Sequence, residues 1–262
     1  MKYLWTELTS AELRSLKDED PIVLIPVGAV EQHGPHLPTG VDGYLAESVC
    51  VGAAKLANKS GLRTVVLPVQ WVGYSPHHLS LGGSLSLSCE TLVAVLTELS
   101  VSLVQQGYRR VLLVNGHGGN GACVDMAATD AGRQMYGQGI IGALSYFSLV
   151  SERQSEFRES GSGGMGHACE FETSLMLSLY PELVEMERVQ DHIPQPYLQN
   201  TNNDLFGSKK VRIYREYSAV TPNGVVGQPS LATSEKGEII FEICCEELAQ
   251  TIKNISEKEI TN

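Results

Sequence analysis

The sequence predicts an α/β fold built on a mostly parallel, doubly wound sheet. Short apolar runs without polar alternation are typical of strands that are buried on both faces. Segments with apolar residues at helical spacing lie between these runs, which indicates that helices connect parallel strands. The chain has 262 residues, of which 42% are hydrophobic, so it can bury one large core. No linker-like composition divides it, and we expect one domain over residues 1–262.

The first elements can be followed from the N-terminus. Thr9–Glu12 has the form of a capping box, which predicts a short helix beginning there. Ile22–Val27 is an apolar run and predicts the first buried strand. Residues 28–41 are rich in glycine and proline and predict a loop, since both residues interrupt regular structure. From Asp42 to Leu56 apolar residues recur at helical spacing, so a helix is expected after the loop.

The alternation continues to the end of the chain. Further strands are expected at Arg63–Val69, Val111–Val114 and Ile140–Phe147, and further helices at Leu92–Val104, after the glycine-rich turn to about Met135, at His167–Leu179 and at Ser234–Ile255. Gly107 is expected just past the end of the helix before it. Residues 190–230 are rich in Pro, Asn, Gln and Gly, with one possible strand near Val211–Tyr214. Because long irregular stretches inside compact domains are usually functional or disordered, we expect a lid or an oligomer contact.

Composition excludes several classes of partner. The formal charge is −11, from 30 acidic and 19 basic residues, so the surface should repel nucleic acid and anionic lipid. The six cysteines include no C-x-x-C pair, which favours reduced thiols in a reducing cytoplasm. Residues 1–18 lack the regions of a signal peptide, and no apolar run approaches the roughly 18 residues of a membrane span. We therefore expect a cytoplasmic protein with no nucleic-acid or membrane partner.

Side chains that can bind metals follow the predicted strands at three places. In an open parallel sheet, ligands bind beyond the carboxyl ends of the strands. The candidates are Glu31, His33, His36 and Asp42 after the first strand, His117 after Val111–Val114, and His167 and Glu170 at the start of the 167–179 helix. Residues i and i+2 of an extended segment face the same side, and residues i and i+3 of a helix share a face. We therefore expect these side chains to converge at one edge of the sheet.

The ligand types indicate which metals would bind. A mixture of imidazoles and carboxylates suits Zn, Mn or Fe better than Ca or Mg. The two oxygens of Asp42 could bridge two ions about 3.5–4 Å apart. Each residue also has a simpler interpretation: Glu31 as a solvated surface acid, His33 as a loop histidine and Asp42 as a helix N-cap. The metal hypothesis depends on the whole set falling where the fold would place a site.

A competing hypothesis comes from the same glycine-rich turn. Gly116–Gly121 matches the G-x-G-x-x-G pattern of dinucleotide-binding proteins, after a strand and before a helix. That motif should be followed about 20 residues later by an acidic residue that ends the next strand and holds the ribose. The next predicted strand ends at Ser145–Phe147 without an acid. A nucleotide-binding oxidoreductase remains the alternative from a different functional class.

The motifs that hold these residues resemble those of the creatininase (creatinine amidohydrolase) family. They are Gly28–Pro38, Thr39–Asp42, Asn115–Asn120, His167–Ser174, Pro222–Gly227 and Lys236–Gly237. The resemblance covers about residues 1–180 and 218–250, and its first motif is long and ordered. It implies a three-layer α/β/α sandwich, two divalent ions, hydrolysis of a linear or cyclic amide, and a homo-oligomer that is often a hexamer.

The resemblance also implies the ligands. Glu31, His33 and His117 would bind metal, and Asp42 would bridge the two ions. Creatininase proper has a glutamate two residues after the histidine of the turn, and this chain has Gly119 there. The resemblance to other branches of the family instead implies a fifth ligand from the motif His167–Ser174, at the position of Glu170.

The remaining roles concern protons and substrate. His167 matches a histidine that handles protons in the family, and it would protonate the departing nitrogen. Glu172 could orient a metal ligand, as nearby carboxylates commonly do. Glu172 could equally cap its helix or pair within it. We expect His78 and the turn glycines Gly118 and Gly119 to contact the substrate, although His78 could instead belong to a surface loop.

The sequence argues against creatinine as the substrate. Creatininase sandwiches a flat ring between tryptophans, but this chain has only Trp5 and Trp71, and neither lies in the corresponding loop between about residues 147 and 166. The expected partner is a small-molecule amide. Relatives in the family include a formamidopyrimidine nucleotide deformylase and a peptide-trimming enzyme of mycofactocin maturation, and both remain open.

Overall fold

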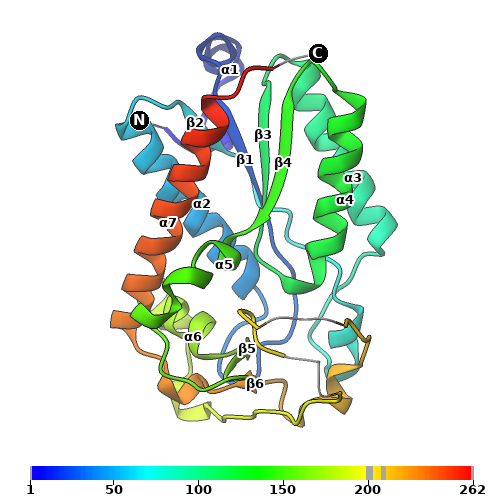
Figure 1. Cartoon of the computed structure of the whole chain (residues 1–262), viewed down its shortest axis with the longest axis vertical. Coiled ribbons are helices and arrows are strands. Elements are labelled where there is room, and N and C mark those ends of the chain that lie inside the picture. The colour runs from blue at the N-terminus through cyan, green and yellow to red at the C-terminus, as the bar shows by residue number, and fades with distance from the viewer. Residues whose placement is uncertain (1, 199–202, 208–210, 261–262) are drawn as a thin grey trace.

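The computed structural model describes residues 2–198, 203–207 and 211–260, and its centre is a sheet with helices on both faces (Figure 1). The strand order is β2-β1-β3-β4, and every pairing in this sheet is parallel. The strands are β1 (Ile22–Val27), β2 (Thr64–Val66), β3 (Arg110–Asn115) and β4 (Ile140–Ser145). The predicted α/β fold with a mostly parallel central sheet is confirmed.

Two groups of helices complete the three layers. The group on one face contains α2 (Val41–Lys59) and α7 (Ser234–Ser256), and the group on the other contains α3 (Cys89–Gln105) and α4 (Gly121–Gln134) (Figure 1). The shorter helices are α1 (Ser10–Leu16), α5 (Tyr146–Leu149) and α6 (Glu170–Leu179). Because crossovers between parallel strands carry helices over the sheet, both of its faces are covered.

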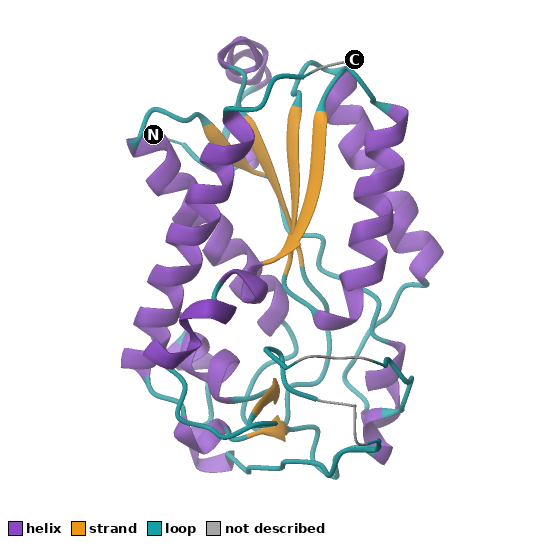
Figure 2. Ribbon diagram, in the orientation of Figure 1, coloured by secondary structure: helices purple, strands orange, loops and turns teal. Residues whose placement is uncertain are grey.

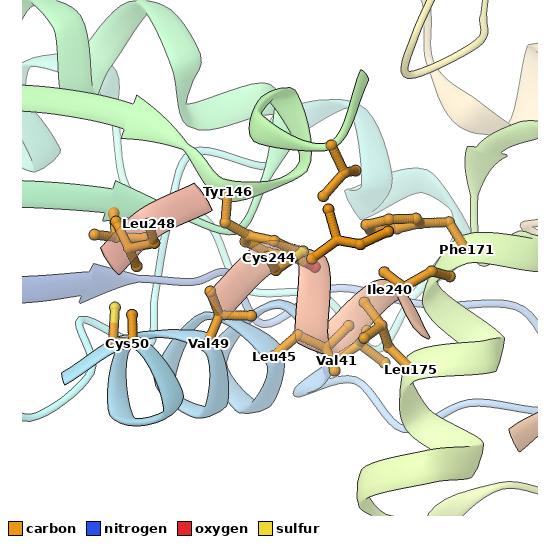
Figure 3. Packing of buried hydrophobic residues seen from close by; sticks show 14 of the residues in the cluster. Val41, Leu45, Val49, Cys50, Tyr146, Phe171, Leu175, Ile240, Cys244 and Leu248 are labelled. Carbon is orange, nitrogen blue, oxygen red and sulfur yellow. The ribbon is translucent and has the colours of Figure 1, made fainter. Parts of the chain in front are cut away.

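The core is divided into two layers by the central strands. Leu24 of β1 packs in the cluster that contains α2 and α7, whereas its neighbours Val23 and Ile25 pack in the cluster that contains α3 and α4. Successive side chains of a strand point to opposite faces, so a wholly apolar strand supplies both layers. Figure 3 shows the core layer between the sheet and the helices α2 and α7, where Leu45 of α2 and Cys244 of α7 belong to the same buried cluster.

A small second sheet lies beyond the carboxyl ends of the parallel strands and was not expected from the sequence (Figure 2). In it, β5 (Met165–His167) pairs antiparallel with β6 (Val226–Gly227). The predicted helix over His167–Leu179 is therefore wrong at its start, since α6 begins at Glu170. Ala168 has a φ of 49° between the strand and the helix, which turns the chain sharply at this junction.

Three further predictions differ from the structure. β2 ends at Val66, before Pro68, which has no N–H to continue the ladder. β4 ends at Ser145, and the next residues form α5. The possible strand at Val211–Tyr214 has no regular structure.

Capping residues in the sequence predicted the start of α1 and the end of α3 correctly. Thr9 and Glu12 form the reciprocal bonds of a capping box at the start of α1. Gly107 follows the C-cap of α3 with a φ of 101°, a conformation that favours glycine. Among the described residues, no helix combines the length and apolar character that crossing a bilayer requires.

Candidate metal centre

The loop from β1 to α2 brings an acid and an imidazole to the carboxyl end of the sheet. Backbone hydrogen bonds hold this loop, including Glu31 N–H to the Thr39 carbonyl at 2.9 Å. The His33 Nδ1–H donates to the Glu31 carbonyl at 3.1 Å. Because Nδ1 is used in this way, Nε2 is the ring atom that His33 turns to the site. Glu31 is fully buried and His33 is nearly so.

Asp42, in the first turn of α2, lies between two groups of possible ligands. Its Oδ1 is 3.4 Å from His33 Nε2, and its Oδ2 is 3.5 Å from His117 Nδ1. His117 Nδ1 is also 3.2 Å from Glu31 Oε1, and His33 Nε2 is 3.8 Å from Glu172 Oε1. Glu31, Asp42 and His117 thus form one candidate group, and His33, Asp42 and Glu172 form another. The two groups share Asp42, as a bridging carboxylate requires.

The contacts in this cluster fit coordination better than hydrogen bonding. Direct N–H···O bonds are usually about 2.7–3.2 Å long, and most of the separations here are longer. Donor atoms bound to one ion at about 2.0–2.2 Å in a tetrahedron lie about 3.3–3.6 Å apart. Among the described residues, Glu31 Oε1, His33 Nε2 and Asp42 Oδ2 are buried without a hydrogen-bond partner. Since orphaned buried polar atoms are unfavourable, these residues fit divalent cations.

The charges of the cluster perturb one another strongly. Burial, together with the nearby Glu31 carboxylate, raises the pKa of Asp42 to about 6. Burial disfavours a charged His117, but Glu31 and Asp42 outweigh this effect and raise the pKa of His117 to about 9. The cluster contains three buried carboxylates, those of Glu31, Asp42 and Glu172. Such perturbed groups in a pocket are typical of functional sites.

Glu170 lies outside the cluster, so its predicted position among the ligands is wrong. Its carboxylate accepts hydrogen bonds from the N–H groups of Glu159 and Ser160, at 3.0 and 2.9 Å, and from Lys236 Nζ at 2.7 Å. Because α6 begins at Glu170, Glu170 and Glu172 are only two positions apart in a helix, where side chains project about 200° apart. Glu172 points to the cluster, and Glu170 anchors the loop before β5.

His36, the other histidine of the first motif, also lies outside the cluster. Its Nε2 is 2.9 Å from the hydroxyl of Thr173 in α6, and the residue is buried. Burial lowers the pKa of His36 to about 4, so the ring is neutral at pH 7. His36 thus ties the β1–α2 loop to α6.

His167 contacts the cluster from β5. Its Nδ1 is 3.5 Å from Glu31 Oε1, and it forms a third possible ligand group with Glu31 and His33. The His167 Nε2–H donates to the carbonyl of Gln32 at 2.7 Å, which leaves the lone pair on Nδ1. Burial, followed by the charge of His33, lowers the pKa of His167 to about 4. The neutral ring can therefore accept a proton at Nδ1.

Gln32 is a site residue that we did not anticipate from the sequence. Its side-chain amide donates to His78 Nδ1 at 2.9 Å and to the Gly224 carbonyl at 3.2 Å. The bond fixes the His78 tautomer, so that Nε2 carries the proton and faces Glu31 Oε1 at 3.5 Å. The only sequence signal was its place between Glu31 and His33, with its side chain on the opposite side of an extended segment.

We expect Gln32→Leu to reduce kcat about 10- to 100-fold, because residues that orient the groups around a metal typically contribute that much. Metal content should be unchanged, since Gln32 is not among the clustered ligand atoms. Steady-state kinetics and elemental analysis on the same preparation test this. Gln106→Leu, at the exposed end of α3, is the matched control. Wild-type kcat in Gln32→Leu would refute the positioning role.

The glycine-rich turn brings His117 against the cluster. A Cβ on Gly119 would lie 2.2 Å from His117 Nε2 and 2.7 Å from the Tyr74 carbonyl, so this position excludes any side chain. A Cβ on Gly118 would meet nothing within 4 Å, and this residue borders open space. The Asn120 amide donates to the Gly28 carbonyl at 2.9 Å and holds the turn against the first loop. The turn thus places His117 beside the other candidate ligands.

A cavity of about 460 Å³ lies over the cluster. Gly118, Gly119 and His78 line it, as do His167 and Glu172. Its outer wall comes from described residues between positions 197 and 220, which fits the expectation of a covering segment. In that wall the ring of Tyr217 lies 3.9 Å from the His78 ring, centroid to centroid. This volume is typical of small-molecule sites.

Comparison with known proteins identifies the family. The model of the family described as "Creatininase: Creatinine amidohydrolase" matches residues 6–252. The chain belongs to the creatininase family. It is 33% identical over 251 residues to the creatinine amidohydrolase of Pseudomonas putida, which covers 89% of each chain. The chain is a metal-dependent hydrolase of this family, which favours hydrolysis over the nucleotide-binding alternative.

Other creatininase-family relatives act on different compounds. The 3-dehydro-scyllo-inosose hydrolase of Thermotoga maritima is 29% identical, over 96% of this chain and 83% of the relative. The mycofactocin precursor peptide peptidase of Mycobacterium ulcerans is 32% identical, over 90% of this chain and 86% of the relative. Family membership therefore does not by itself define the substrate.

Solved creatininase structures agree with the fold and the candidate metals. A structure named creatininase Mn has a TM-score of 0.84 and 29% identity, and it covers 97% of this chain and 98% of its own. A mutant creatininase of Zn–Zn type has a TM-score of 0.83, the same identity and the same coverage. The expectation of Zn or Mn is therefore supported by the structural neighbours.

Proposed function

We propose that this chain hydrolyses a non-peptide C–N amide bond of a small molecule with the help of two divalent cations. The ligands would be Glu31, His33, Asp42, His117 and Glu172. The observation that carries the proposal is the position of Asp42, whose two oxygens face two different groups of ligand atoms. Divalent ions held there would lower the pKa of water and polarise the amide carbonyl.

His167 is the residue that would move the proton. Its Nε2–H is bound to the Gln32 carbonyl, so Nδ1 is the atom that can accept a proton from the attacking water. The same Nδ1 then delivers the proton to the departing nitrogen, which leaves as an amine while the carbonyl carbon gains the hydroxyl. Glu172 would act as a ligand beside His33, because its carboxylate oxygen lies 3.8 Å from His33 Nε2, a separation that suits two donor atoms on one ion.

Creatinine itself is disfavoured by the walls of the cavity. Trp71 packs against Tyr44, with ring centroids 5.3 Å apart, and Trp5 packs against Tyr108. Neither tryptophan is among the residues that line the cavity, so among the described residues no indole is available to sandwich a flat ring. A formamidopyrimidine nucleotide and a short peptide remain alternative substrates, because hydrolysis of either also cleaves a C–N amide bond.

Elemental analysis of the purified chain, followed by an assay panel, tests the proposal. The panel would contain creatinine, formamidopyrimidine nucleotides and short peptides, and it would detect released amine, formate or amino acid. We expect two equivalents of Zn or Mn per chain and hydrolysis that stops when a chelator removes them. Hydrolysis that persists after complete metal removal would reject the mechanism.

We further propose that the chain works as one domain, in the cytoplasm and as a homo-oligomer. A single buried cluster includes residues from Ile22 to Ile252, which supports one domain. All six cysteines are free, which supports a reducing compartment. Several apolar side chains between Ile193 and Tyr214 are exposed, which supports contacts between subunits such as those of a hexamer. Light scattering during gel filtration would measure the subunit number.

A further inference from the structure

The outer wall of the cavity carries two arginines that the proposed hydrolysis does not use. Arg212 and Arg215 both line the cavity whose inner end holds the candidate metal ligands. Arg212 is exposed and Arg215 is half-buried. They come from the segment after residue 210, which lies far in sequence from every metal ligand. The cavity therefore has carboxylates at one end and guanidinium groups at the other.

These two arginines differ from most others in the chain. Seven other arginines lie within 4.0 Å of a carboxylate: Arg63, Arg109, Arg110, Arg133, Arg153, Arg158 and Arg188. Arg14 has no such partner among the described residues, but it is exposed on α1 and outside the cavity. Among the described residues, Arg212 and Arg215 have no such partner, although the chain has 30 acidic and 19 basic residues. An arginine left unpaired in a cavity of an acidic protein is available to an anion from outside.

Arg215 is held in place without its charge being neutralised. Its guanidinium lies 4.8 Å from the centre of the Tyr197 ring and donates to the Ala219 carbonyl. Both partners are uncharged, so a cation–π contact and one hydrogen bond fix the group while its other N–H donors stay available. Arg212 has no hydrogen bond among the described residues. A guanidinium presents a planar fork that matches carboxylate and phosphate oxygens.

The opposite end of the cavity does not supply the missing negative charge. The carboxylates that line it are Glu31, Asp42 and Glu172, and all three belong to the metal cluster. Two divalent ions would more than neutralise them. Ions bound there would remove the net negative charge from the inner end, so that end would not repel an anion held by the arginines.

We propose that the substrate carries an oxyanion, a carboxylate or a phosphate, which binds Arg212 and Arg215 while its amide lies at the metal cluster. This inference rests on the proposed hydrolysis, because it places the anion relative to the amide. Binding a remote group positions the bond to be cleaved, so the arginines determine specificity without taking part in proton transfer. The cavity of about 460 Å³ can hold both ends of such a molecule.

Binding of simple probes tests the arginines separately from catalysis. Isothermal titration calorimetry of the metal-loaded protein would compare glycerol 3-phosphate, D-glycerate and glycerol, which share a carbon skeleton and differ in charge. We expect at least one anionic probe to bind at least 10-fold more tightly than glycerol. Tighter binding of glycerol 3-phosphate indicates a phosphate-bearing substrate, and tighter binding of glycerate indicates a carboxylate. Equal binding of all three would overturn the proposal.

Variants then locate the anion. The double variant Arg212→Ala with Arg215→Ala should weaken anion binding at least 10-fold and leave glycerol binding unchanged. Arg133→Ala, which removes one guanidinium from the exposed surface of α4, should leave anion binding unchanged. Arg212→Lys with Arg215→Lys keeps both charges and should restore part of the binding, which separates a charge effect from misfolding.

The metal-site variant Asp42→Asn separates this inference from the proposed function. Anion binding that persists in Asp42→Asn but disappears in the double alanine variant supports the inference even if no amide substrate is found. Anion binding that persists in the double alanine variant but disappears in Asp42→Asn would place the anion on the metal ions and overturn it.

Discussion

Replacing Asp42 with asparagine is expected to abolish turnover and the binding of both cations while the fold remains intact. Asp42 faces His33 with one oxygen and His117 with the other, so both candidate ion positions depend on it. An amide offers one neutral oxygen in place of two charged ones and cannot bridge two ions. We expect kcat to fall by at least ~10³, which corresponds to about 4 kcal/mol of lost transition-state stabilisation.

Metal-dependent stabilisation gives a readout of Asp42→Asn that does not require a substrate. A ligand at 100 times its Kd stabilises the folded state by about 2.7 kcal/mol. In a chain of this size, that should raise the Tm of the wild type by about 5–10 °C. Asp42→Asn should show almost no rise. Its metal-free form should be as stable as the metal-free wild type, because burial and Glu31 already oppose the charge of Asp42.

The control for this experiment is Glu47→Gln, which removes a half-buried carboxylate from the same helix, α2, outside the ligand groups. It should keep two metals per chain and the full rise in Tm. An Asp42→Asn protein that retained two metals and wild-type turnover would show that Asp42 does not bridge.

The second large effect distinguishes two glutamates that lie two residues apart. Glu172→Gln should lose one of the two ions and at least 100-fold in kcat, because its carboxylate completes the group with His33 and Asp42. Glu170→Gln should keep both ions and most of the activity. It should instead lower the free energy of unfolding by about 1–3 kcal/mol, because it removes the buried charge that pairs with Lys236.

Metal analysis and urea unfolding on both variants measure this contrast. The conservative change from Glu to Gln keeps the side-chain volume at each position, so each variant serves as the control for the other. If Glu170→Gln lost a metal and Glu172→Gln did not, the assignment of the second ion position would be reversed.

The parallel sheet with helices on both faces, and four of the clustered side chains, could be predicted from local sequence. Wholly apolar runs such as Ile22–Val27 are stable only when both faces are covered, which places them inside a parallel sheet. The loops after such strands all begin at the same edge of the sheet, where the carboxyl ends of the strands lie. Glu31, His33, Asp42 and His117 were therefore expected together, and the structure places them within contact distance.

The position of the fifth acid could not be predicted from sequence because it depends on pairing between distant segments. Helical periodicity is the same whether α6 begins at His167 or at Glu170, so local pattern cannot set the start. Pairing of β5 with β6, about 60 residues later, keeps His167 extended and delays the helix. That delay turns Glu172 toward His33 and Glu170 toward Lys236.

The sequence by itself determined the parallel α/β sheet and the mixed imidazole and carboxylate ligand set, because burial patterns and ligand types are local properties of the chain, and amide hydrolysis followed from the resemblance of its motifs to the creatininase family. Only the tertiary structure decided the Gln32 contacts and the unpaired arginines of the cavity wall. A polar side chain in an irregular segment has no periodic signal in sequence. Its role is set by which distant residues come within a few ångströms after folding.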